Sequence, residues 1–216
     1  MKKRKEWRNK MVLNNFNKNN SVFRTWKIDT QSRLKRAFEL DLSHAKIKKF
    51  VNDPVIYEEV WGVLFKHSRR IKDIFTYGIG VSSFPSISWL GFWNMCTTWK
   101  IVGKGLSLNT IDRVFIATNY EEVEQEDNPD RDLWRYEFYE IIVRLAYEKY
   151  YKSKIWSSIA NATEKLLGDI YERWTHYWAW QEWREEWIWT TKVNDLLKVN
   201  LVGLKKVYSS YFNQMK

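Results

Sequence analysis

The 216-residue chain contains a single cysteine, Cys96, so it forms no internal disulfide bond and no zinc site built from several cysteines. Its three histidines, His44, His67 and His176, are far apart in the sequence. None lies in an HExxH pattern or beside a nucleophile motif. The segment Gly103–Gly105 lacks the spacing and the Ser or Thr of a phosphate-binding P-loop. We therefore expect a protein without enzymatic activity and with no cofactor, unless one loop described below holds calcium.

Long apolar runs are also missing. No stretch approaches the roughly 18 consecutive apolar residues of a membrane span, and no apolar segment follows the basic N-terminal residues as in a secretory signal. We therefore expect no transmembrane segment and a cytoplasmic location. Hydrophobic residues make up 44% and aromatic residues 17% of the chain, which predicts a folded protein with a core rather than a disordered one.

Positive charge is concentrated near the N-terminus. Residues 1–56 contain 15 Lys and Arg against 5 Asp and Glu, whereas residues 57–216 contain 21 of each. We therefore expect a basic extended arm that binds a polyanion: an acidic protein surface, which we favour, or nucleic acid or anionic lipid. The candidate polyanion-binding residues of this arm are Lys2, Lys3, Arg4, Lys5, Arg8, Lys10, Lys18 and Arg24.

Apolar residues recur at three- and four-residue spacings through most of the chain, which predicts an all-α fold. The expected helices cover residues 32–50, 54–77, 92–101, 138–148, 157–171 and 192–212, and one more follows Asn109. Asp53 and Pro54 form a typical helix start, with Asp as cap and Pro at the first helical position. Asn109 is expected to cap its helix, with Asp112 three residues later.

An acidic loop precedes the helix that begins near residue 138. When Glu137 is placed at the last position of a twelve-residue calcium loop, oxygen-bearing side chains fall at alternate positions, as a hard cation requires. Arg131 stands where such loops have Gly, however, so a solvated acidic loop before an ordinary helix is the alternative. The candidate calcium ligands are Glu126, Asn128, Asp130, Asp132 and Glu137.

A second loop, Gly78–Gly91, has the same layout but contains no carboxylate, so we expect it to bind no calcium. Ile87 in this loop and Leu133 in the acidic loop occupy the same position. We therefore expect these two residues to pair in a short antiparallel strand that joins four helices into one lobe.

Residues 57–216 resemble a group of EF-hand-type domains in ciliary and cytoskeletal proteins of single-celled eukaryotes. The resemblance rests on residues 111–119, Asn128–Arg131, Arg135–Phe138 and Val143–Ala146. It implies a degenerate EF-hand-like four-helix lobe, with extra flanking helices, that is used for docking and often lacks calcium.

The chain contains 14 Trp, six of them between residues 174 and 189. Such a cluster indicates core packing or a surface that contacts a partner, and less readily a membrane-interface helix. The high ratio of Trp to Cys also suggests that a codon translated as Trp in this sequence encodes another residue in the organism. Trp134 is the candidate position. The residues expected to face a partner are Trp174, Trp178, Trp180, Trp183 and Trp187.

The last helix repeats the pattern of the helix that starts at Pro54, at an offset of 133 residues. Val60 matches Val193, and Leu64 matches Leu197. A repeat unit that cannot bury its own apolar face needs a neighbour, so we expect this helix to pack on another chain, or the sequence to be a shortened copy of a tandem protein.

Four segments are therefore predicted: a basic extended arm (1–31), a helical linker (32–52), the EF-hand-like lobe (53–154) and a helical extension (155–216). The expected function is that of a structural docking protein in a microtubule-based axonemal assembly of a cilium or flagellum. The arm would bind acidic tubulin and the lobe would bind neighbouring cytoskeletal proteins. The alternatives are a calcium sensor that uses residues 126–137, a nucleic-acid-binding protein, and a supernumerary subunit of an organelle complex.

Overall fold

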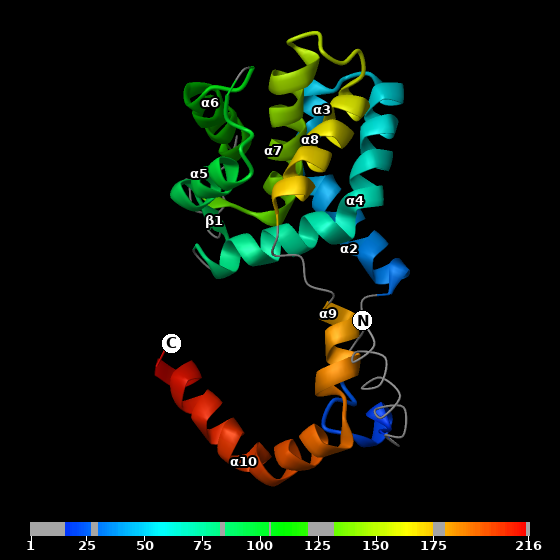
Figure 1. The fold of residues 1–216 in the computed structure, drawn as a ribbon, viewed down its shortest axis with the longest axis vertical. Helices are drawn as coiled ribbons and strands as arrows, with labels where there is room; N and C mark the ends of the chain where they lie inside the picture. Colours follow the sequence, from blue (N-terminus) through cyan, green and yellow to red (C-terminus); the bar gives the residue numbers. More distant parts are fainter. Residues whose placement is uncertain are drawn as a thin grey trace, which may run out of the picture. The chain divides into compact units, whose positions relative to one another are not determined.

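The computed structural model of the chain describes residues 16–26, 30–82, 85–103, 105–120, 132–174 and 180–214. It divides into two compact units, which we call the larger unit (residues 30–177) and the smaller unit (residues 1–29 with 178–216). Helices dominate both units, and within the described ranges the only sheet has two short strands. The prediction of an all-α protein is therefore confirmed (Figure 1).

The larger unit contains most of the helices. Its elements are α2 (Gln31–His44), α3 (Ile47–Phe50), α4 (Pro54–Gly80), β1 (Ile87–Ser88), α5 (Trp89–Thr98), α6 (Leu108–Asn119), β2 (Asp132–Leu133), α7 (Arg135–Ala146), a π-helical turn η2 (Tyr147–Tyr151) and α8 (Ile159–Arg173). The smaller unit contains a 3-10 helix η1 (Lys18–Asn20), α9 (Trp180–Trp183), a π-helical turn η3 (Arg184–Ile188) and α10 (Thr191–Gln214).

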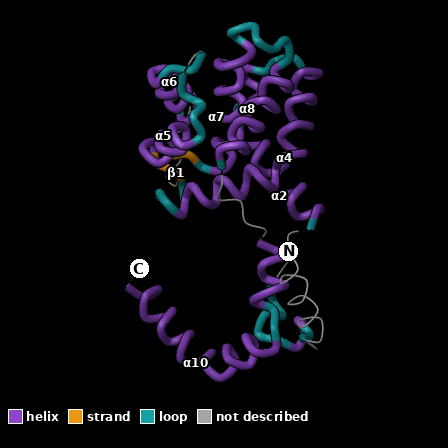
Figure 2. The backbone as a smooth tube through the Cα atoms, viewed as in Figure 1, coloured by secondary structure: helices purple, strands orange, loops and turns teal. Residues whose placement is uncertain are grey.

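Helix α7 lies at the centre of the larger unit and contacts α2, α4, α6 and α8 (Figure 2). Almost every side chain from Glu137 to Ala146 is buried, as in a helix with no solvent face. Two of these side chains are carboxylates. Glu140 accepts hydrogen bonds from the Lys46 backbone N–H at 2.7 Å and from Arg144 Nε at 2.8 Å, which offsets the cost of burying its charge.

The predicted strand pair is present. Ile87 of β1 lies opposite Leu133 of β2 in an antiparallel pair, and both side chains are fully buried. Ile87 also packs closely on Gly78 of α4, where an added Cβ would lie 2.6 Å from Ile87 Cδ1. The pair therefore connects the segment that follows α4 to the segment that precedes α7.

Helix boundaries depend on local capping groups. The Asp53 carboxylate accepts hydrogen bonds from the Val55 and Ile56 backbone N–H groups, with Pro54 at the first helical position, so the predicted start of α4 is confirmed. The predicted cap Asn109 is wrong, because Ser107, two residues earlier, caps α6 by accepting from the Thr110 backbone N–H at 3.2 Å.

The predicted single helix over residues 32–50 is divided into α2 and α3. The break occurs at Ala45 and Lys46, where the Lys46 backbone N–H bonds to the buried Glu140 instead of continuing α2. This segment, predicted to be a linker, contributes to the core of the larger unit through Phe38, which contacts the rings of Trp61, Phe65 and Tyr139. Helix α8, predicted to belong to the extension over 155–216, also packs on α4 and α7 within this unit.

Candidate functional site

The predicted calcium loop is described only at its end. Glu126, Asn128 and Asp130 lie outside the described residues. Asp132 accepts a hydrogen bond from Ser86 Oγ at 2.7 Å, which links the two strands. Glu137 is fully buried and accepts from the Trp134 backbone N–H at 2.8 Å, which stabilises the start of α7. In the described part of the chain, no three His, Cys, Asp or Glu side chains are grouped so that they could hold a metal ion.

Trp134 occupies the N-cap position of α7, where Ser, Thr, Asp or Asn is preferred. Its indole has no acceptor for the helix N–H groups, and its Nε1–H is buried without a hydrogen-bond partner among the described residues. These features make the position unusual for Trp. Mass spectrometry of this position in protein isolated from its natural source tests the alternative decoding.

The N-terminal arm is only partly described. Lys2, Lys3, Arg4, Lys5, Arg8 and Lys10 lie outside the described residues.

The prediction of an extended arm is wrong for residues 16–26, which form η1 and a following turn. The Asn17 side chain caps η1, and Lys18 Nζ donates to the Trp26 carbonyl at 2.5 Å and lies 5.4 Å from the Trp189 ring. Lys18 thus has a structural role within the smaller unit, whereas Arg24 is exposed.

The predicted partner-facing Trp residues have different environments. Trp174 is only 6% exposed and belongs to the core of the larger unit, so its predicted contact with a partner is wrong. Trp174 is the C-cap residue of α8, a position that the spacing to Trp178 did not indicate. Trp183 and Trp187 are exposed to 43% and 46%. Trp178 and the side chain of Trp180 lie outside what the structure describes.

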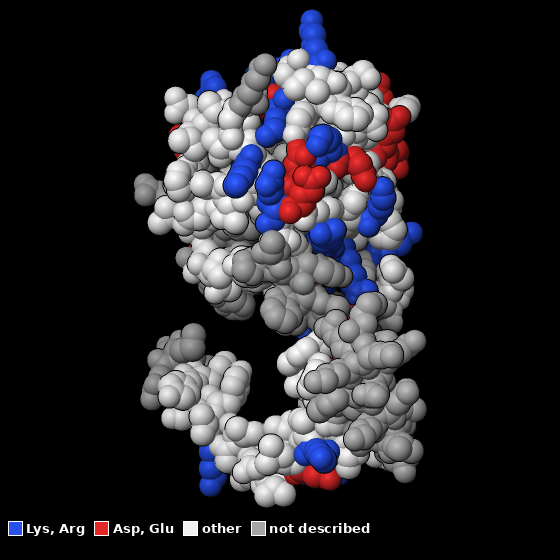
Figure 3. All heavy atoms as spheres, viewed as in Figure 1, with Lys and Arg blue, Asp and Glu red and all other residues white. Residues whose placement is uncertain are grey.

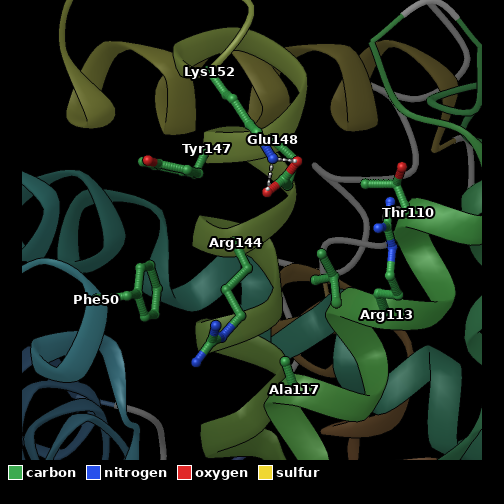
Figure 4. Close-up of a pocket in the computed structure, with 9 residues that line it drawn as sticks. Phe50, Thr110, Arg113, Ala117, Arg144, Tyr147, Glu148 and Lys152 are labelled. Carbon is green, nitrogen blue, oxygen red and sulfur yellow. Dashed lines mark hydrogen bonds and ion pairs between the residues drawn. The ribbon is translucent and has the colours of Figure 1, made fainter.

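The larger unit has a cleft of about 360 Å³ between α3, α6, the end of α7 and η2, which the sequence did not predict (Figure 4). Two of the cations that line it are paired: Arg144 Nε with Glu140, and Lys152 with Glu148 at 2.9 Å. Its described lining residues include no histidine or cysteine. The lining residues are Phe50, Thr110, Arg113, Val114, Ala117, Arg144, Tyr147, Glu148 and Lys152.

Helix α10 presents an apolar surface that the packing of the described residues leaves exposed. The first turn of this helix is anchored in the smaller unit, because Asn194 is buried and its Oδ1 accepts from the Val22 backbone N–H at 2.9 Å. Thr190 Oγ1 accepts from the Val193 backbone N–H, so Thr190 caps the helix. Beyond this anchor, nine apolar or aromatic side chains are exposed: Leu196, Val199, Leu201, Val202, Leu204, Val207, Tyr208, Tyr211 and Phe212. We call residues 196–212 the exposed segment of α10.

Comparison of the chain with protein-family models, with curated proteins and with solved structures found no match. Within the described ranges, none of the helices combines the length and the apolar character needed to cross a membrane.

Proposed function

We propose that the chain is a non-catalytic docking protein that uses α10 to attach to a neighbouring protein in a larger assembly. The observation that carries this proposal is the exposure of the apolar side chains of α10, including Val199 at 84% and Tyr208 at 69%. Contiguous exposed apolar surface of this kind is typical of protein interaction sites. A helix of this length gains most of its stability in proteins from packing such a face against something else.

Helix α4 has a similar apolar pattern whose face is covered. Val60, Leu64 and Ile71 of α4 are fully buried against other helices of the larger unit. At an offset of 133 residues they correspond to Val193, Leu197 and Leu204 of α10. Val193 and Leu197 are half-buried, and Leu204 is 49% exposed. The pattern that is fully covered in α4 is therefore partly open in α10, which supports a partner for the exposed segment of α10.

We further propose that the assembly is microtubule-based, as in the axoneme of a cilium or flagellum. The support is the charge distribution, since the excess of Lys and Arg lies within residues 1–56 and a basic segment attracts acidic surfaces such as that of tubulin. The resemblance of residues 57–216 to EF-hand-type docking domains points to the same class of assembly. Calcium has no role in this proposal, because Asp132 and Glu137 already bond within the protein.

Co-sedimentation with polymerised microtubules tests the microtubule part of this proposal. The full chain is expected to pellet with microtubules at low salt, and binding is expected to fall when the acidic tubulin tails are removed by proteolysis. Replacing Lys2, Lys3, Arg4 and Lys5 together with Gln is expected to weaken binding. A matched variant with Lys35 and Arg36 of α2 changed to Gln is the control. A full chain that stays in the supernatant at low salt would contradict the proposal.

A further inference from the structure

The charged side chains of α10 after Asp195 are all positive. Lys198, Lys205 and Lys206 follow the anchored first turn, and no Asp or Glu occurs after Asp195. At 100° per residue, Lys198 and Lys205 lie together along one edge of the apolar face formed by Leu197, Leu201, Leu204, Tyr208 and Tyr211. A partner that complements this helix therefore has an apolar floor and carboxylates along one rim. In Figure 3 most of the described surface of α10 is uncharged, with small charged areas.

The apolar surface is wider than the seam of a two-stranded coiled coil, which uses two positions in seven. Leu196, Val207 and Phe212 extend the face on both sides, and each is exposed. Val199 and Val202 lie beyond it and are 84% and 68% exposed. Burying this much of the circumference requires a groove that encloses the helix rather than a single helix beside it.

The larger unit shows how this chain covers a similar helix. Helix α4 packs its apolar face against α7 and α8. Glu164 of α8 lies at the edge of that contact, where it pairs with Lys66 at 2.7 Å and with His67 at 3.0 Å. At the offset of 133 residues Lys66 and His67 correspond to Val199 and Asn200, so this ion pair has no lysine counterpart in α10. What the two helices share is the apolar face, which α4 buries against α7 and α8.

A second copy of the chain fits α10 less well. An antiparallel pair of α10 helices would place the lysines at 198 and 205 of one copy beside those of the other, which is repulsive. The surface of α7 and α8 that covers α4 is already occupied by α4 in each copy. The charge of an antiparallel pair and the surface already taken by α4 therefore both favour a different protein.

We propose that α10 binds in the apolar groove of a separate acidic helical protein of the calmodulin type. This inference rests on the proposed docking function and names the chemistry of the partner. Helix-in-groove recognition uses anchors at helical spacing, and basic amphipathic helices are its usual ligands. The apolar floor of the groove contacts Leu197, Leu201, Leu204 and Tyr208. The carboxylates of its rim pair with Lys198 and Lys205 of α10.

Calorimetric titration of the full chain with calcium-loaded calmodulin tests this partner class, because calmodulin offers a methionine-rich apolar groove only when calcium is bound. We expect binding in the micromolar range or tighter with calcium and none with excess chelator. Leu204→Asp is expected to weaken binding at least about tenfold and Lys205→Glu about threefold or more. Ser209→Asn, on the polar face, is the matched control and is expected to stay within about twofold. Circular dichroism establishes that each variant keeps its helix content.

Three results would overturn the proposal. The first is no binding at about 50 µM of each protein. The second is a concentration-dependent dimer in sedimentation velocity that Leu204→Asp dissociates, which would identify a second copy as the occupant. The third is calcium-independent binding to phosphatidylcholine vesicles with about 30% phosphatidylserine that Leu204→Asp abolishes, which would identify a membrane surface. A negative calmodulin titration together with intact microtubule co-sedimentation would reject the partner class and leave the docking function standing.

Discussion

Ile87 of β1 and Leu133 of β2 lie directly opposite each other in an antiparallel pair, and neither side chain is exposed. Around them, Ser86 Oγ donates to Asp132. Glu137, four residues after β2 ends, accepts a hydrogen bond from the Trp134 backbone N–H, so polar contacts flank this junction. The junction joins the α4–α5 segment to the α6–α7 segment. The stability of the larger unit should therefore depend on it.

Replacing Ile87 or Leu133 with Ala is expected to lower the free energy of unfolding by about 2–4 kcal/mol each, because each change leaves a cavity in a fully buried site. Urea denaturation of both single variants and of the double variant measures the coupling between them. We expect the double variant to lose less than the sum, since the two residues are paired neighbours. If the double variant instead lost the sum of the two single losses in free energy of unfolding, the two residues would not be coupled. Val199→Ala, at an 84% exposed position, is the control.

Gly78 and Gly62 of α4 provide a matched pair of substitutions. An added Cβ at Gly78 would lie 2.6 Å from Ile87 Cδ1 and 3.0 Å from Met95 Sδ, so Gly78→Ala is expected to destabilise the protein by about 1–3 kcal/mol. Nothing lies within 4 Å of a Cβ at Gly62. Gly62→Ala is therefore expected to stabilise the protein by about 0.5–1 kcal/mol, since Ala favours a helix interior over Gly. Equal effects of both changes on the melting temperature would contradict the close contact with Ile87.

Calcium is expected to leave the melting temperature of the full chain unchanged, because Glu137, the final ligand of the predicted loop, is buried and bonded to the Trp134 backbone N–H. Glu137→Ala is expected to destabilise the protein by about 1–2 kcal/mol through loss of this cap, with or without calcium. Differential scanning calorimetry in calcium and in chelator makes the comparison. A calcium-dependent rise in melting temperature that Glu137→Ala removes would instead favour the sensor function.

Several features of the fold follow from local sequence patterns. The spacing of apolar residues located the helices because one face of each helix must be buried, and Asp53 with Pro54 marked a helix start through their own chemistry. The pairing of Ile87 with Leu133 followed from placing both residues at the same position of two similar loops. Each of these signals is contained in a short stretch of sequence.

Other features depend on contacts between distant segments, which no local pattern encodes. The break between α2 and α3 occurs because the Lys46 backbone N–H bonds to Glu140, while Lys46 Nζ donates to the Thr118 carbonyl at the end of α6. Trp174 belongs to a sequence cluster of Trp residues, yet it packs into the core of the larger unit. The cleft next to Arg113 forms only when α3, α6, α7 and η2 come together.

Asp169 of α8 is expected to make stability depend on acid pH. Burial alone would raise the pKa of this carboxyl, but hydrogen bonds from Lys165 Nζ and Tyr150 Oη, with the nearby lysine charges, lower its pKa below the ordinary value. A carboxyl with a lowered folded-state pKa stabilises the folded protein above its unfolded-state pKa of about 3.9, and this stabilisation is lost as the pH falls through the folded-state pKa. The loss attributable to Asp169 is therefore expected below about pH 4.

The variant Asp169→Asn removes this titration while keeping the shape of the side chain. We expect it to lower the free energy of unfolding at pH 7 by about 1 kcal/mol and to make the decline of stability below about pH 4 less steep than in the unmodified chain. Urea denaturation at a series of pH values measures both effects. The matched control is Asp112→Asn, an exposed carboxylate on α6 for which we expect a change of at most about 0.5 kcal/mol. If Asp169→Asn and the unmodified chain lost stability in parallel as the pH fell, the Asp169 carboxylate would not be held by Lys165 and Tyr150 as described.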